Sequence, residues 1–237
     1  MSELLNFQRS LELTGQIINL CAALMLLIGF AMLSQRRILT LINLFMMQGM
    51  VLAASTLIVA LTTGQSHLYW SVGLTVLLKV IGLPYILHRL IRQLSVKWDV
   101  ETLLNIPTTM LAGIALVIVA FNVAQPISQL AGTITRSTLG IALACVLLSF
   151  LMMITRSKAV PQVIAFLSME NGLFFAATSA TYGMPMVVEL GIALDVMVGM
   201  VILAVFFFQI REQFDSLDIR HMERVHDEAS EEARRNI

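Results

Sequence analysis

Charged side chains are scarce in this sequence, and their scarcity excludes an ordinary soluble domain. Asp, Glu, Lys and Arg make up 13% of the 237 residues, whereas a soluble domain carries about 25%. Hydrophobic residues make up 58%, and the mean hydropathy is +0.85. The 15 basic and 15 acidic residues cancel, so no basic excess indicates nucleic-acid binding. The composition predicts a polytopic membrane protein.

Metal-binding and nucleophilic motifs are also missing. The two cysteines, Cys21 and Cys145, lie inside apolar runs and lack the Cys/His clustering of a zinc or iron–sulfur site. No phosphate loop or nucleophile–base grouping is visible. The histidines are scattered: His67, His88, His221 and His226. We therefore expect no disulfide, no cofactor and no active site within this chain.

Seven apolar runs can each cross a bilayer, which takes roughly 20 residues in a helix. They are 15–33, 38–62, 68–90, 104–124, 137–154, 160–182 and 184–210. None shows the alternating pattern of a membrane β-barrel strand. The expected fold is therefore all-α, a polytopic membrane protein with seven transmembrane helices.

Basic residues gather on one side of the predicted spans. Twelve fall in the loops after the first, third and fifth spans and in the C-terminal tail, whereas two, Arg9 and Arg136, fall on the other side. Because cytoplasmic loops hold the excess of Lys and Arg, we expect the N-terminus outside and the C-terminus in the cytoplasm.

An internal repeat becomes visible when the second and sixth spans are aligned with a shift of 123 residues. Residues 46–49 (MMQG) then match residues 169–172 (MENG), and the flanking basic loops also agree. We predict two parallel three-helix repeats joined by one helix. The repeats are 1–103 and 136–210, residues 104–135 hold the linking helix and an outer loop, and residues 211–237 form a charged cytoplasmic tail.

Two carboxylates, Glu170 and Asp195, lie near the middle of the last two spans. A charge at that depth costs about 2.5–3.5 kcal/mol on insertion scales, so such residues face a bundle interior or a water path and often transfer protons. Asp195 shares a helix face with Gly191 and Gly199, whose spacing permits close helix packing. The alternative role of Asp195 is a hydrogen bond across that helix contact.

Glu170 is followed by Asn171 and Gly172, a polar step in an otherwise apolar helix, and we assign Gly172 to helix packing. No basic residue lies near Glu170 on its own helix. Desolvation therefore favours the neutral acid, which is the state that a proton relay uses. The plainer alternative is a structural carboxyl that stays protonated.

Lys79 is the charged residue inside the third span, where it shares a helix face with Thr75 and Gly82. Its stem does not easily reach an interface about 15 Å away. Lys79 therefore either pairs with a carboxylate, of this or another subunit, or carries a proton itself. Glu189, about two turns before Asp195, is either an exit group for protons or an ordinary interfacial acid.

The tail at 211–237 differs from the rest of the chain because it holds eight acids and five arginines. Its apolar positions follow roughly helical spacing. The tail either docks as a helix on a cytoplasmic partner or remains solvated.

The last three spans resemble the three-helix K-type subunit of NADH dehydrogenase complexes and its relatives in cation/proton antiporters. The match rests on a basic loop at 156–158, on SMENG at 168–172, and on Asp195-x-x-x-Gly199 before an apolar run. That family carries one membrane carboxylate on its middle helix and one on its last, positions taken here by Glu170 and Asp195. The chain departs from the pattern in having aspartate at 195 and a first repeat without carboxylates inside its predicted spans.

Over its full length the sequence is similar to the component E family of hydrogenase-4, membrane subunits of formate-hydrogenlyase-type nickel–iron hydrogenase complexes. The resemblance implies a bacterial inner membrane, antiporter-like and H-type membrane partners, and a peripheral arm with iron–sulfur clusters and a nickel–iron centre. We expect a non-catalytic subunit of an oxidoreductase complex, in which Glu170, Asp195, Lys79 and Glu189 belong to a midplane proton path. The alternatives are a subunit of a multi-component cation/proton antiporter and a scaffold that conducts no ions.

Overall fold

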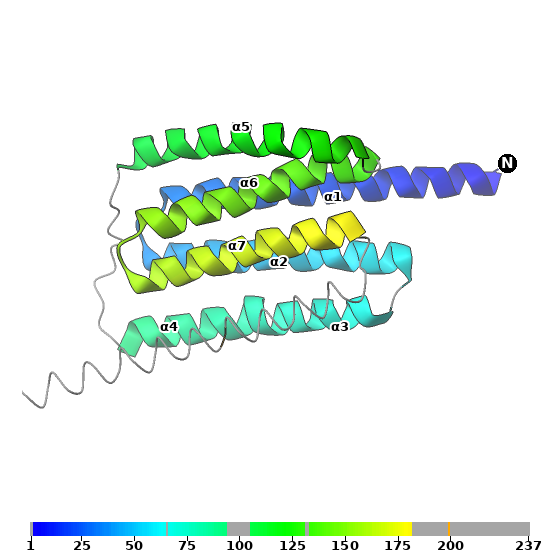
Figure 1. Cartoon of the computed structure of the whole chain (residues 1–237). Coiled ribbons are helices and arrows are strands. Elements are labelled where there is room, and N and C mark those ends of the chain that lie inside the picture. The colour runs from blue at the N-terminus through cyan, green and yellow to red at the C-terminus, as the bar shows by residue number, and fades with distance from the viewer. Residues whose placement is uncertain (1, 65, 94–104, 131–132, 182–198, 200–237) are drawn as a thin grey trace, which may run out of the picture. The chain divides into compact units, whose positions relative to one another are not determined.

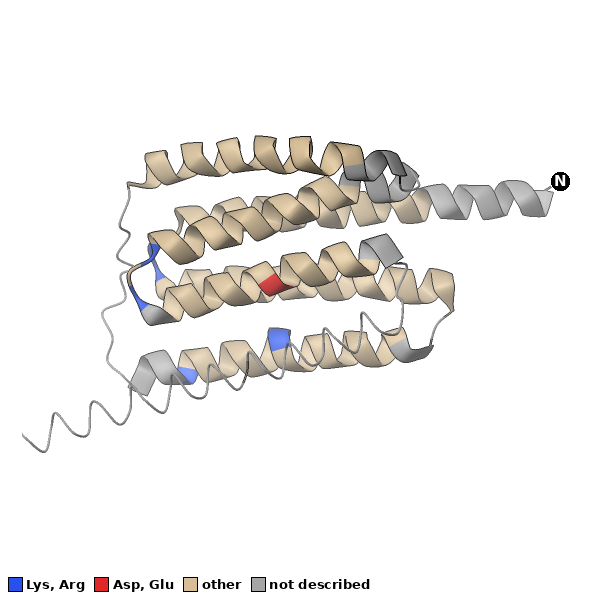
Figure 2. Ribbon diagram, viewed as in Figure 1, with Lys and Arg blue, Asp and Glu red and all other residues tan. Residues whose placement is uncertain are grey.

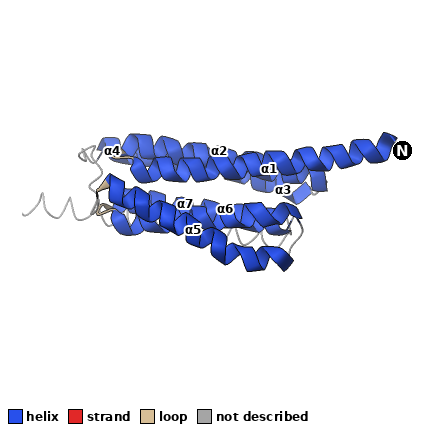
Figure 3. Ribbon diagram, turned by 90° about the horizontal axis from the view of Figure 1, so that it is seen from above, coloured by secondary structure: helices blue, strands red, loops and turns tan. Residues whose placement is uncertain are grey.

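The computed structural model describes residues 2–64, 66–93, 105–130, 133–181 and 199. Its elements are helices throughout these ranges (Figure 3). They are α1 (Ser2–Ser34), α2 (Ile38–Thr63), α3 (Ser66–Thr75), the π-helical segment η1 (Val76–Gly82), α4 (Leu83–Gln93), α5 (Ile106–Leu130), α6 (Thr133–Thr155) and α7 (Ala159–Thr181).

Six stretches of these helices are long and apolar enough to cross a membrane, which confirms the prediction of an all-α polytopic membrane protein. They are Leu13–Ser34, Ile38–Thr63, Leu68–Arg89, Ile106–Pro126, Thr138–Thr155 and Val160–Thr178. The seventh predicted span, 184–210, lies outside the described residues except for Gly199. The count of seven and the orientation in the membrane therefore stay predictions.

The helices form two layers (Figures 1 and 3). One layer contains α1, α2 and the continuous helix α3–η1–α4, and the other contains α5, α6 and α7. Between the layers, α1 packs on α6 and α2 packs on α7, and each pair runs in the same direction (Figure 1). The predicted repeat requires these directions, because it makes α1 equivalent to α6 and α2 equivalent to α7. Its third helix in the second copy lies outside the described residues, so the repeat stays a prediction.

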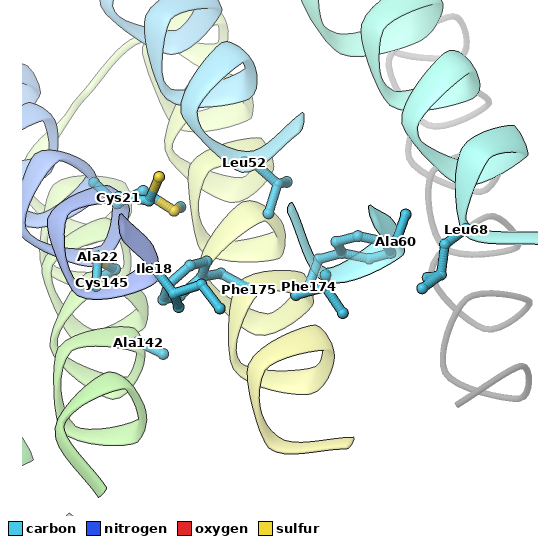
Figure 4. Packing of buried hydrophobic residues seen from close by; sticks show 12 residues of the cluster. Ile18, Cys21, Ala22, Leu52, Ala60, Leu68, Ala142, Cys145, Phe174 and Phe175 are labelled. Atoms are coloured by element: carbon cyan, nitrogen blue, oxygen red, sulfur yellow. The ribbon is translucent and has the colours of Figure 1, made fainter. Parts of the chain in front are cut away.

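An apolar cluster joins the two layers (Figure 4). It combines small, larger aliphatic and aromatic residues from α1, α2, α3, α6 and α7: Ile18, Cys21, Ala22, Met25, Leu52, Val59, Ala60, Leu68, Ala142, Cys145, Phe174 and Phe175. Small residues let membrane helices approach closely, and the two phenylalanines fill the space that remains. Cys21 and Cys145 are buried free thiols within this cluster.

The third span is not a uniform α-helix, because the π-helical segment Val76–Gly82 interrupts it. Within this region the Leu83 N–H donates to the Leu78 carbonyl, five residues earlier. Pro84 supplies a physical reason, since a proline ring collides with the carbonyl four residues before it in a regular α-helix. The wider turns that precede Pro84 relieve that collision.

The π-helical segment also changes which side chains of the third span are buried. Ser71, Thr75 and Lys79 recur every four residues and are all buried. The next buried position is Pro84, five residues after Lys79, whereas Gly82 is only partly covered. The predicted face shared by Thr75, Lys79 and Gly82 therefore holds for its first two members. It fails at the third because it assumed an unbroken α-helix.

Candidate ion-pair site within the bundle

A buried ion pair joins the third and sixth spans. Lys79 lies in the π-helical segment η1, and its Nζ is 3.1 Å from Oε1 of Glu170 on α7. The two side chains are 1% and 3% exposed. Each lies near the middle of its span, Leu68–Arg89 or Val160–Thr178, and Figure 2 shows the basic and the acidic position facing each other across the layers. The pair is therefore buried within the bundle near the middle of both spans.

Two carboxamides extend this pair into a polar network across three helices. Lys79 Nζ donates to Asn171 Oδ1 at 2.9 Å, and Asn171 Nδ2 donates to Gln48 Oε1 on α2 at 3.4 Å. An ammonium group has only donors, so the Asn171 oxygen must face Lys79 and its nitrogen must face away. Gln48 accepts from that nitrogen and so holds the amide in the orientation that Lys79 requires.

Several groups surround the side chain of Lys79. A Cβ placed on Gly49 of α2 would lie 3.5 Å from the Cβ of Lys79, an ordinary van der Waals contact, so the backbone of α2 runs beside the lysine stem. The Phe174 ring centroid lies 5.8 Å from Lys79 Nζ, within the range of a cation–π contact. The charged end of Lys79 is therefore bounded by a ring, a carboxylate and an amide oxygen.

Gly172 sits on another face of α7, where that helix meets α6. A Cβ at Gly172 would lie 3.1 Å from a methyl carbon of Val146 and 3.3 Å from the Val146 backbone nitrogen. Both distances are shorter than ordinary van der Waals contacts, so residue 172 must be small for α6 and α7 to pack as they do. One turn of α7 thus carries the ionisable group on one side and a close contact with α6 on another.

The surroundings of Glu170 differ from the expected ones. The expectation of a neutral acid rested on the absence of a cation on α7 itself, but the neighbouring helix supplies one in Lys79. Of the two roles considered for Lys79, the structure shows the pairing, and the carboxylate belongs to the same chain.

Other predicted site residues fall outside the described residues: Asp195, Glu189 and Gly191. Gly199 is described, and a Cβ there would meet no atom within 4 Å, so its role in helix packing stays a prediction. Sequence reasoning did not assign Gln48 and Asn171 to the site. A signal for them was present, because the predicted repeat pairs these two positions with a shift of 123 residues.

Comparison with known proteins gives distant relatives. No family model matches the sequence, and no solved structure matches it. An uncharacterised protein of Mycobacterium tuberculosis, Rv0085, is 28% identical over 213 residues, which cover 89% of this chain and 96% of that protein. Hydrogenase-4 component E of Escherichia coli K12 and of Shigella flexneri is 23% identical over 212 residues, which cover 89% of this chain and 98% of those proteins. The chain is therefore distantly similar to hydrogenase-4 component E over most of its length.

Proposed function

We propose that this chain is an integral membrane subunit of a complex-I-like nickel–iron hydrogenase, in which the Lys79–Glu170 pair forms part of a proton path coupled to electron transfer. The observation that carries the proposal is the ion pair itself, which is buried at mid-span and bonded to the Asn171 carboxamide, which in turn bonds Gln48. The distant similarity to hydrogenase-4 component E over 89% of the chain supports the choice of complex.

The chemistry of the pair suits proton transfer. Lys79 and Glu170 are both protonatable and lie within hydrogen-bond distance. Moving one proton from the ammonium to the carboxylate converts two charges into two neutral groups without changing the net charge. In a low-dielectric interior each charge is expensive unless it is paired, so an incoming or departing proton shifts the balance between these two states. A charged group elsewhere in the membrane plane also shifts the balance between the ionised pair and the neutral pair.

The remaining parts of the proposal come from the sequence. Asp195 and Glu189 continue the path in the last predicted span, and the chain forms seven helices arranged as two parallel three-helix repeats. The partners are antiporter-like and H-type membrane subunits together with a peripheral iron–sulfur and nickel–iron arm. The complex lies in the bacterial inner membrane with the N-terminus of this chain outside and its C-terminus in the cytoplasm.

Co-purification tests the choice of complex. The full chain, tagged at its C-terminus, is isolated from membranes in mild detergent, and its partners are identified by mass spectrometry. Nickel and the absorbance of iron–sulfur clusters should accompany it. Recovery of antiporter subunits without nickel or iron would instead place the chain in a cation/proton antiporter.

Proton movement in membrane vesicles tests the proposed path, with a pH-sensitive dye as the readout. Glu170→Asp keeps the acid but withdraws it by one methylene, so partial proton movement is expected. Glu170→Gln removes the exchangeable proton, so proton movement should stop. Ser168→Ala is the matched control, because Ser168 is a buried polar residue of the same helix whose hydroxyl bonds Ser149 at 2.8 Å and cannot titrate in this range. An equal loss in all three variants would indicate damage to α7 and would remove the support for a proton path.

A further inference from the structure

Arg156 is a buried arginine far from the ion pair. It follows the span Thr138–Thr155 in the loop between α6 and α7, and it is 1% exposed. Its Nη2 donates to the carbonyl oxygens of Met32 at 3.1 Å and Leu33 at 3.0 Å, in the last turn of α1. Carbonyls at the end of a helix have no partner within that helix. One nitrogen of Arg156 therefore caps α1 and links the end of α1 to the loop between α6 and α7.

The other two nitrogens of this guanidinium lack acceptors. Arg156 Nε and Nη1 are buried and have no hydrogen-bond partner among the described residues. Burial, and next the charge of Arg36, lower the pKa of Arg156 to about 10. A buried donor without an acceptor is costly, and more so when it is charged. Among the described residues, the neighbourhood of Arg156 thus adds positive charge and offers no balancing anion.

Further basic residues lie at the same end of the bundle, as Figure 2 shows for the loops between α1 and α2 and between α6 and α7. Arg36 and Arg37 are exposed in the first loop, and Lys158 is partly exposed in the second. The sequence contains no Asp or Glu between residues 13 and 93 or between residues 105 and 169. These helices and loops therefore supply no carboxylate to balance the arginines.

We propose that Arg156 and Arg36 bind a phosphate group at this end of the bundle, either the headgroup phosphate of an anionic phospholipid or free phosphate. The position fits, because lipid phosphates lie just beyond the hydrocarbon core, where the span before Arg156 ends. The side chains fit as well, since guanidinium groups pair with phosphate through charge-assisted hydrogen bonds. Arg36 is exposed and forms the accessible side of the site, and Arg156 forms its buried side.

Lipid binding by the purified full-length protein tests this proposal. The probes are vesicles of phosphatidylglycerol with phosphatidylcholine, vesicles of phosphatidylcholine alone, and inorganic phosphate. The readouts are the number of lipids retained in native mass spectrometry and the thermal unfolding midpoint. The test variant is Arg36→Gln, which leaves the Arg156 cap on α1 intact. Arg37→Gln is the matched control, because it removes the same charge from the adjacent exposed position.

Phosphatidylglycerol should raise the unfolding midpoint of the parent protein more than phosphatidylcholine does. Losing one charge-assisted hydrogen bond should weaken that binding about ten-fold in Arg36→Gln, while Arg37→Gln should stay close to the parent. A shift produced equally by inorganic phosphate identifies the free anion as the ligand, and a shift confined to the lipid identifies the headgroup. Equal binding by both variants and the parent would overturn the proposal. The proposal would also be overturned if the rise in the unfolding midpoint were lost when residues 211–237 are deleted, although lipid is present. A carboxylate of the chain would then balance the arginines.

Discussion

Replacing both members of the Lys79–Glu170 pair by methionine separates a structural role of the pair from a conducting one. A single substitution does not, because it leaves the other member buried without its counter-charge. Breaking a buried pair in this way costs about 3–5 kcal/mol, whereas replacing the whole pair by apolar residues of similar size is often neutral or stabilising. The double variant therefore removes both protonatable groups and keeps the packing.

The stability cost of each single variant depends on the residue that remains. That residue avoids an unpaired charge by losing a proton, if it is Lys79, or by gaining one, if it is Glu170. At neutral pH, giving up the proton costs an ordinary lysine about 4.6 kcal/mol, and taking one up costs an ordinary glutamate about 3.7 kcal/mol. Lys79→Met, which leaves the carboxyl, should therefore be slightly milder than Glu170→Gln, which leaves the ammonium. The double variant leaves Asn171 Oδ1 without the donor that Lys79 supplied, at a cost of about 1–3 kcal/mol. We expect it to assemble better than either single variant.

The assay measures two quantities in the same membranes. The amount of assembled complex is read from native gels, and proton movement is read in vesicles with a pH-sensitive dye and normalised to that amount. The double variant should assemble close to the parent and move no protons. Parental proton movement per assembled complex in the double variant would refute the proton path. Assembly of the double variant no better than that of the single variants would refute the argument from pairing.

Three further outcomes are expected. Gly172→Ala should lose about 1–3 kcal/mol of stability because its Cβ would press against Val146, whereas Gly73→Ala, where a Cβ meets nothing within 4 Å, should be neutral or gain up to about 1 kcal/mol; thermal unfolding in detergent distinguishes them. Gln48→Met should leave the Asn171 amide nitrogen without its acceptor, and it should slow proton movement in vesicles while the assembled complex persists. A reporter active only in the cytoplasm should work when fused to the C-terminus and fail in the loop between α2 and α3.

The membrane spans were predictable because length and apolar composition determine them almost alone. All six described spans agree with the predicted ones to within a few residues. The partner of Lys79 was not predictable to the same degree. A residue's own helix can be read from periodicity, but which helix faces it depends on packing between the two layers. Glu170 therefore appeared as an isolated acid in the sequence and is paired in the structure.

Arg156 illustrates a second limit of sequence reasoning. In the sequence it counted as one of several basic loop residues that indicate orientation and support the predicted repeat and the family resemblance. The structure buries it against the end of α1, because its long side chain reaches carbonyls that lie more than a hundred residues earlier in the chain. Loop composition reports the charge of such a residue, but not whether that charge meets water or protein.

The π-helical segment η1 bears on how this chain should align with its relatives. A π-type turn holds about one more residue than an α-helical turn, so Val76–Gly82 is equivalent to a regular helix with an insertion. On either side of it the buried residues follow α-helical spacing, with Ser71 and Thr75 before it and Pro84 and Leu87 after it, while Lys79 lies within it. Deleting one residue there would therefore rotate one half of the span against the other without shortening either buried face. A single-residue gap at this point in a relative would indicate that its third helix is regular and that any lysine there has turned away from the sixth span.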